Sequence, residues 1–130
     1  MAIKHLWDTN TIIYYLQQQF PPQVEKFIDH LLLNEKPSFS AITEIELLSW
    51  KVASEKDVAM LHDFINDAYV IELDRPIKWK AAELRKRYAI KLPDAIIGAT
   101  AILHGLTLLT RNQKDFENIA GLVCLNPWNI

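Results

Sequence analysis

The sequence predicts an α/β domain in which helices cover both faces of a mostly parallel, five-stranded sheet. Short apolar stretches bounded by turn residues alternate along the chain with longer segments of helical periodicity. The connections between them are short, and no repeat, linker or low-complexity segment interrupts the 130 residues. We therefore expect one domain over residues 1–130 with three layers, α/β/α.

Five short stretches have the composition of strands. Each is rich in apolar or β-branched residues and is followed by polar or turn-forming residues. They are residues 3–7, 38–42, 69–73, 106–109 and 122–125. Helices are expected between them, at residues 12–16, 22–34, 55–68 and 76–88, after Thr43, and from Pro93 to Leu103, with a short helix near Asp115.

The helix that begins at Pro93 is expected to be buried and central. Proline suits the first helical position, and Asp94 lies in the first turn, where free N–H groups favour a carboxylate. Residues 95–103 are small and apolar on almost every face. Gly105 is suited to the left-handed conformation that ends many helices.

Composition places the chain among ordinary globular domains, with 50% hydrophobic residues, 23% charged residues and a net charge of −2. We expect no membrane span, because no apolar stretch reaches roughly 18 residues, and no leader, because Asp8 and Asn10 interrupt the first apolar stretch. The single cysteine, Cys124, is expected in a buried strand and fits the reducing cytoplasm. The net charge neither indicates nor excludes a nucleic-acid partner.

Four acidic residues are predicted to meet at one edge of the sheet. Asp8 directly follows the first strand, and Asp115 lies just past the fourth. Glu46 is placed in the first turn of the helix after the second strand, and Asp94 opens the helix that leads into the fourth. Sites in open α/β sheets form beyond the carboxyl ends of the strands, so we expect these carboxylates to converge.

Each of these acids also has a purely structural explanation. Asp8 and Asp94 suit helix N-termini, and Glu46 stands in the capping-box position relative to Thr43. Asp115 could be a surface residue before Phe116. Glu44 is the alternative to Glu46 in the same helix. The remaining acids considered are expected on solvated helix faces: Glu25, Asp29, Glu35, Glu55, Asp57, Asp63, Asp67, Glu83 and Glu117.

Four converging carboxylates require a cation, because like charges at close range raise one another's pKa. Oxygen ligands in this number suit Mg²⁺ or Mn²⁺. The histidines are scattered and give no zinc pattern: His5, His30, His62 and His104. With only three glycines, the chain lacks a glycine-rich phosphate loop. These features predict phosphodiester chemistry by metal-activated water, with one metal or two left open.

Four blocks of the sequence resemble the signature blocks of PIN-domain nucleases, and more narrowly those of VapC toxins of bacterial type II toxin–antitoxin pairs. The blocks match in order and spacing, and the resemblance covers essentially the whole chain. They are residues 8–10 (Asp-Thr-Asn), 40–47, 92–101 and 109–116.

The resemblance implies a Mg²⁺- or Mn²⁺-dependent endoribonuclease that forms a homodimer and is inhibited by a cognate antitoxin. The family's four metal-site acids map onto Asp8, Glu46, Asp94 and Asp115. Thr110 and Asn112 match polar positions beside the site. One PIN subgroup has an acid where Asn112 stands, so a second metal would depend more heavily on Asp115 here.

Basic residues beside these blocks are candidate contacts for RNA phosphates, with exposed surface cations as the alternative explanation. They are Arg87, Lys91, Arg111 and Lys114. Aromatic side chains could stack on bases, but most lie in apolar runs and are expected in the core or a dimer interface. They are Trp7, Tyr14, Tyr15, Trp50, Trp79 and Trp128.

Three other functions remain open from the sequence. A receiver-type signalling domain also gathers acids at strand ends, but it needs a lysine after the last strand, where this chain has Leu125-Asn126-Pro127. A PIN fold could serve only as a protein-binding scaffold, which four intact acids argue against. A DNA-directed nuclease would use the same site chemistry.

Overall fold

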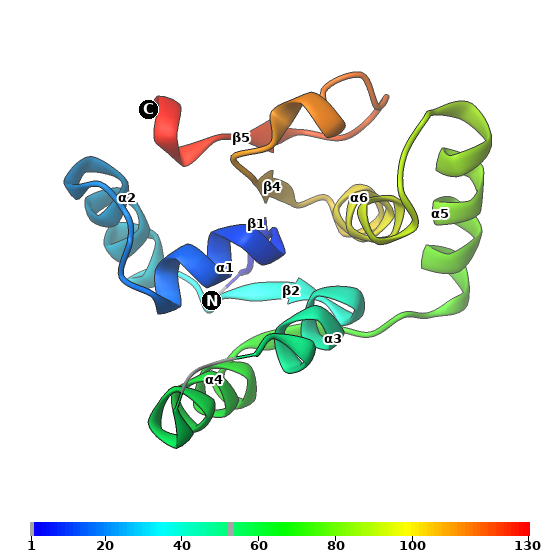
Figure 1. The fold of residues 1–130 in the computed structure, drawn as a ribbon. Coiled ribbons are helices and arrows are strands. Elements are labelled where there is room, and N and C mark those ends of the chain that lie inside the picture. Colours follow the sequence, from blue (N-terminus) through cyan, green and yellow to red (C-terminus); the bar gives the residue numbers. More distant parts are fainter. Residues whose placement is uncertain (1, 52–53) are drawn as a thin grey trace.

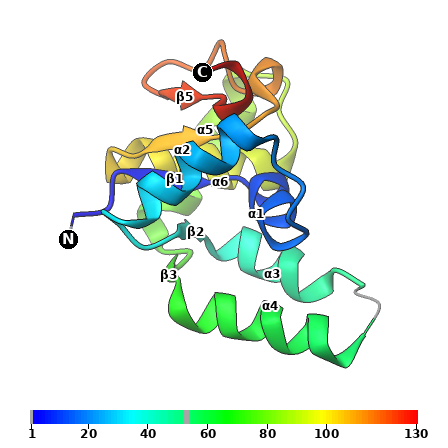
Figure 2. The same ribbon diagram turned by 90° about the vertical axis from the view of Figure 1, so that its left-hand side faces the viewer.

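The structure of the protein is a computed structural model, which describes residues 2–51 and 54–130. It has the predicted three-layer α/β/α architecture. In Figure 1, α5 (Arg75–Arg87) and α6 (Leu92–His104) lie to the right of the strands, and α2 (Pro22–Leu32) lies to the left. The figures both show α4 (Glu55–Asp67) beside α3 (Ala41–Ser49) at the bottom of the molecule (Figures 1 and 2).

All paired strands are parallel, and they form two sheets. One has the order β1 (His5–Trp7), β4 (Thr107–Leu109), β5 (Cys124–Leu125), and the other pairs β2 (Ser38–Ser40) with β3 (Tyr69–Ile71). A side chain joins the two sheets, because the Ser38 hydroxyl donates a hydrogen bond of 2.6 Å to the carbonyl of His5. The predicted five strands are therefore present, although each is shorter than expected.

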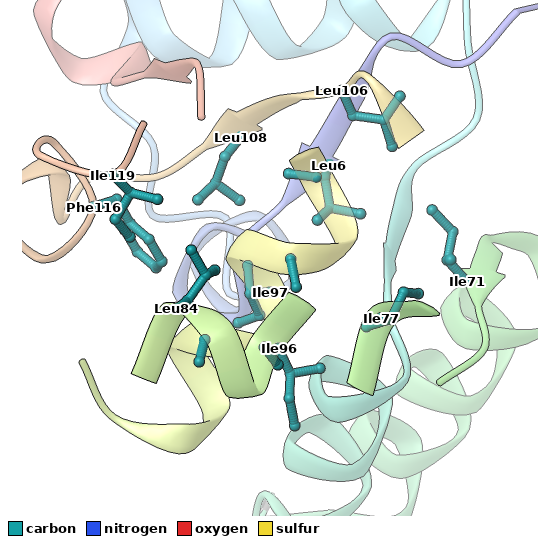
Figure 3. Close-up of a cluster of buried hydrophobic side chains, with 14 residues drawn as sticks. Leu6, Ile71, Ile77, Leu84, Ile96, Ile97, Leu106, Leu108, Phe116 and Ile119 are labelled. Atoms are coloured by element: carbon teal, nitrogen blue, oxygen red, sulfur yellow. The ribbon is translucent and has the colours of Figure 1, made fainter. Parts of the chain in front are cut away.

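Alternate strand residues point to opposite faces, and each face has its own hydrophobic core. Leu6 and Leu108 pack with α5 and α6, and Figure 3 shows this cluster. Their neighbours Trp7 and Leu109 pack with α1 (Thr9–Leu16), α2, α3 and α4 on the other side. This two-residue alternation is what a sheet covered by helices on both faces requires.

Helix α6 occupies the position predicted for it and is buried from Ala95 to Ala101. It packs against α5, α3, β2 and β4. The helix begins one residue earlier than expected, at Leu92, so Pro93 is at its second position and Asp94 remains in the first turn. Gly105 ends it with φ 64°, in the left-handed conformation that glycine adopts without strain.

The predicted start of α3 is wrong. Ser40 caps this helix, and its hydroxyl accepts a hydrogen bond of 3.2 Å from the backbone N–H of Thr43. The strand consequently ends at Ser40, and the acid in the first turn is Glu44. Glu46 lies two residues further along, in the second turn, so the expected capping box with Thr43 does not form.

The prediction of a solvated Glu35 is also wrong. Its side chain is only 4% exposed, and it lies beyond the end of α2. Its Oε1 accepts hydrogen bonds from the backbone N–H groups of Lys4 and His5, and it lies 3.1 Å from Nδ1 of His5. The carboxylate thus ties the segment before β2 to the start of β1. Cys124, predicted to be buried in a strand, lies in β5 but is only partly buried.

Across the described residues, none of the helices combines the length and the apolar character needed to cross a membrane.

We expect Ile97→Ala to destabilise the protein by about 2–4 kcal/mol, because it opens a cavity in the core beneath α6. Ile97 is 1% exposed, whereas Leu103 on the same helix is 45% exposed. Leu103→Ala is therefore the matched control and should change stability by less than about 0.5 kcal/mol. Urea unfolding measures both values, and equal effects of the two substitutions would contradict the central place of α6.

Candidate active site

Asp8 directly follows β1, and two hydrogen bonds hold its side chain in position. It is the N-cap of α1, and its Oδ1 accepts a hydrogen bond of 2.8 Å from the backbone N–H of Thr9. Its Oδ2 accepts a second bond of 2.8 Å from the hydroxyl of Thr110, which directly follows β4. The side chain is 8% exposed. The structural explanation of Asp8 as a cap is thus correct, and it leaves a buried carboxylate at the sheet edge.

Thr110 and Asn112 connect Asp8 to Asp115. The Thr110 hydroxyl accepts a hydrogen bond of 3.0 Å from the backbone N–H of Asn112. The Asn112 amide in turn donates a short hydrogen bond to Oδ2 of Asp115, in the 3₁₀ turn Gln113–Asp115. A chain of polar contacts therefore runs from β1, through the segment after β4, to the exposed carboxylate of Asp115.

Glu46 reaches the same region from α3 through a residue next to Asp8. The Thr9 hydroxyl lies 2.6 Å from Oε1 of Glu46, to which it donates, and 3.1 Å from the hydroxyl of Thr43. No such contact links Glu44 to the site within residues 2–51 and 54–130. The geometry therefore favours Glu46 over Glu44, as expected from sequence, and the capping box that was the structural alternative for Glu46 is not formed.

The electrostatics show that four carboxylates act on one another. Burial raises the pKa of Asp94 to about 6, with further increases from the negative charges of Asp8, Asp115 and Glu46. Lys91 has a smaller, opposite effect on this pKa. The pKa of Asp8 is also raised, chiefly by burial and then, against its hydrogen bonds, by the charges of Glu46 and Asp115. The four carboxylates therefore lie near enough for the charges of Asp8, Glu46 and Asp115 to influence the pKa of Asp94.

The carboxylate cluster fits a hard cation by the type of donor and by charge. The raised pKa values express the free energy needed to keep these groups ionised together, and a divalent ion would remove that penalty. As the side chains stand, no three His, Cys, Asp or Glu residues in the described part of the chain are grouped tightly enough to hold one ion. Coordination would therefore require side-chain movement toward the ion.

A cleft of about 470 Å³ opens beside Asp8. Its lining combines the carboxylate of Asp8 with polar groups from α1, the following loop and the segment after β4. The lining residues are Asp8, Asn10, Ile13, Tyr14, Gln17, Gln19, Arg111 and Asn112.

The four basic residues predicted to contact RNA occupy different positions. Arg111 lines the cleft. Lys91 precedes α6 and is close enough to lower the pKa of Asp94. Lys114 is exposed in the same 3₁₀ turn as Asp115. Arg87 is at the end of α5, where its Nη1 lies 3.8 Å from Oε1 of Glu83.

Sequence reasoning predicted Thr110 and Asn112 beside the site but missed the contacts of Thr9 with Glu46 and of Trp128 with Arg111. Thr9 belongs to the recognised block at residues 8–10, but its contact with Glu46 is tertiary and has no signal in the spacing. Trp128 lies 17 positions after Arg111 in the sequence, yet the two side chains meet beside the cleft. Trp128 was expected in the core or in a dimer interface, and its side chain is partly buried.

The comparisons with known proteins agree with this fold. The family profile for the PIN domain matches residues 6–122. The chain therefore belongs to the PIN-domain family.

Similar proteins narrow the resemblance to VapC-like toxins. The toxin FitB of Neisseria gonorrhoeae is 31% identical over 139 residues, covering 95% of this chain and 98% of FitB. The tRNA(fMet)-specific endonuclease VapC of Salmonella typhimurium is 27% identical over 128 residues, covering 92% of this chain and 95% of that protein. The VapC-like character predicted from the four blocks is confirmed.

Solved structures show the same likeness. The structure of FitAcB from Neisseria gonorrhoeae superposes with a TM-score of 0.81 at 29% identity, covering 97% of this chain and 99% of the other. The structure of DNA-bound VapBC from Salmonella typhimurium gives a TM-score of 0.80 at 27% identity, again covering 97% and 99%.

The raised pKa of Asp94 predicts a specific pH dependence of stability in metal-free protein. An unfolded aspartate has a pKa of about 3.9, so between about pH 4 and 6 the folded protein binds more protons than the unfolded chain. Stability attributable to Asp94 therefore falls as the pH rises through this window. Asp94→Asn should remove the fall and stabilise the protein by about 1 kcal/mol above pH 6 in EDTA.

The control for this experiment is Asp63→Asn, which makes the same chemical change at an exposed position of α4. Urea unfolding from pH 4 to 8 measures all three proteins. An Asp94→Asn variant that is no more stable than the wild type at pH 7.5 in EDTA would contradict the electrostatic account.

Proposed function

We propose that this protein is a metal-dependent endoribonuclease and the toxin of a type II toxin–antitoxin pair. The observation that carries the proposal is the set of carboxylates at one edge of the sheet, in which Asp8, Glu46 and Asp115 raise the pKa of Asp94. The names of similar proteins, which include an endonuclease specific for tRNA(fMet), a ribonuclease and a toxin, support the choice of RNA as substrate.

Each acid has a proposed role that follows from how it is held. Asp8, Glu46 and Asp94 provide the oxygen ligands for Mg²⁺ or Mn²⁺, directly or through water. The bound ion supplies an activated water and neutralises charge on the phosphate. Asp115, restrained by Asn112, orients the attacking water or contributes to a second ion site. The reaction proposed is hydrolysis of an RNA phosphodiester by water, which would need no covalent enzyme intermediate.

The hydrogen bonds around Asp8 have a functional consequence in this proposal. Because Thr110 and the Thr9 amide hold both carboxylate oxygens, Asp8 cannot turn away from the negative charges of Glu46 and Asp115. The protein thus holds Asp8 in place before an ion arrives, and the other acids would move toward the ion. Preorganisation of this kind reduces the reorganisation needed on binding.

The cationic residues near the site are proposed to bind the RNA backbone. Lys91 and Lys114 lie next to Asp94 and Asp115 in the sequence, and Arg111 lines the cleft. Arg87 lies at the end of α5 and would contact a more distant phosphate. Lys and Arg provide most of the sequence-independent affinity for nucleic acids.

An antitoxin is the proposed protein partner. The similar solved structures named VapBC and FitAcB are those of paired proteins, two of them bound to DNA or promoter fragments. We also propose a homodimer and a cytoplasmic location, the latter consistent with a single unpaired cysteine among the residues described.

Antitoxin-free protein is expected to cleave single-stranded RNA with Mg²⁺ or Mn²⁺ and to stop when EDTA is added. Asp94→Asn should lower the cleavage rate by about 100-fold or more, because it removes a charged ligand from the ion site. Asp63→Asn, the exposed control on α4, should cleave like the wild type.

Gel analysis of a labelled RNA and of the same sequence as DNA measures these rates. Full activity of Asp94→Asn would overturn the site assignment. Cleavage of the DNA in preference to the RNA would replace the endoribonuclease by a DNA-directed enzyme. A wild-type protein that cleaves neither would favour a non-catalytic scaffold.

A further inference from the structure

Arg111 is held against two aromatic rings at the edge of the cleft. Its guanidinium carbon lies 5.2 Å from the ring centroid of Trp128 and 5.7 Å from that of Tyr14. Its Nη1 donates a hydrogen bond of 3.1 Å to the Tyr14 hydroxyl. The side chain is exposed, so these contacts orient it without burying its charge.

The two rings are themselves fixed by a third. Tyr14, Phe20 and Trp128 contact one another in pairs, with centroid distances of 5.2 Å for Tyr14 to Trp128 and 5.4 Å for Phe20 to Trp128. The backbone beside Trp128 is restrained as well, because Oδ1 of Asn126 accepts a hydrogen bond of 2.9 Å from its N–H. We name Tyr14, Phe20 and Trp128 the aromatic clamp.

The charge of Arg111 is not used to neutralise the protein's own acids. Among the residues described, no carboxylate lies within salt-bridge distance of it, whereas Arg87 and Lys80 each approach Glu83. The charges that shift the pKa of Asp8 and Asp94 do not include Arg111 either. The clamp therefore presents an uncompensated guanidinium in the wall of a cleft that also contains Asp8.

We propose that Arg111 binds a backbone phosphate of the RNA strand next to the phosphate at the carboxylate cluster, and that Tyr14 and Trp128 are positioning residues for its guanidinium. This inference rests on the proposed function. A phosphate suits the site because the planar guanidinium can donate two parallel hydrogen bonds to its oxygens while one face remains on the rings.

Arg111 also differs from the other candidate cations in how strongly its side chain is restrained. Lys91 and Lys114 are exposed side chains, and their flexible stems lose conformational entropy when they bind. The guanidinium of Arg111 is already ordered by the clamp, so less of this cost remains. Arg111 should therefore contribute more to substrate affinity than either lysine.

The test is steady-state cleavage of a labelled single-stranded RNA in Mg²⁺, with kcat and KM measured at several KCl concentrations. Arg111→Gln should raise KM by about tenfold, as expected for a lost hydrogen bond to a charged group, and leave kcat within about twofold. The slope of log(kcat/KM) against log[KCl] should become shallower by about 0.7, the value for one phosphate contact on a single strand.

The clamp variants separate positioning from folding. Tyr14→Phe keeps the ring but loses the hydroxyl, and it should raise KM by about threefold, a smaller effect than that of Arg111→Gln. Trp128→Leu should also raise KM, and Trp128→Phe should recover most of the loss because it restores a ring beneath the guanidinium. In an Arg111→Gln background, Trp128→Phe and Tyr14→Phe should cause no further change in KM, because both rings act through Arg111. If the rings served only the folded structure, these substitutions would change KM in that background as well.

The matched control is Arg75→Gln. Arg75 lies 5.1 Å from the ring centroid of Trp79 on α5, the same type of contact away from the cleft lining. Its KM and salt slope should equal those of the wild type. If Trp128→Leu does not fold, as judged by thermal unfolding, Tyr14→Phe and the double variants carry the test.

The outcomes distinguish this inference from the proposed function. Active wild-type protein with an unchanged KM and salt slope in Arg111→Gln would overturn the inference and leave the nuclease assignment in place. A variant that cleaves normally but resists its antitoxin would assign Arg111 to a protein interface, and would also overturn the inference. Absence of metal-dependent cleavage in the wild type would instead reject the proposed function.

Discussion

Repulsion among four carboxylates at the strand ends is the constraint on which the rest of the site depends. Burial and the neighbouring charges raise the pKa of Asp94 to about 6, even though the N-terminus of α6 favours an ionised acid there. Asp8 cannot relieve the repulsion by rotating, because hydrogen bonds from Thr9 and Thr110 hold both of its oxygens. A bound cation would offset the free-energy cost that burial and the neighbouring charges place on ionised Asp94.

The fold accounts for why these acids meet. Parallel pairing brings the ends of β1 and β4 side by side, since Trp7 is in register with Leu109, and so Asp8 lies next to Thr110. Hydrophobic cores on both faces of the sheet hold α3 and α6 against it, and those helices carry Glu46 and Asp94. Stability and function are therefore linked through the same packing, and the site is formed by elements rather than by a mobile loop.

Sequence patterns predicted the architecture because apolar periodicity and turn residues are local signals. They also predicted the four acids, since carboxyl ends of parallel strands share one edge. The start of α3 was not predicted, because Ser40 and Thr43 are both good caps and only the end of β2 decides between them. Glu35 was mistaken for a surface residue because its partners, Lys4 and His5, lie about thirty positions away. Arg111 and Trp128 are also far apart in the sequence, so no local pattern predicted their contact.

The most direct test of the central claim is the number of protons released when Mg²⁺ binds. Calorimetric titration of antitoxin-free protein at pH 6, in two buffers of different ionisation enthalpy, measures this number. With the pKa of Asp94 at about 6 and that of Asp8 also raised, the account predicts release of about half a proton or more per chain, falling toward zero at pH 8. Saturable binding with no proton release at pH 6, or no binding at either pH, would contradict it.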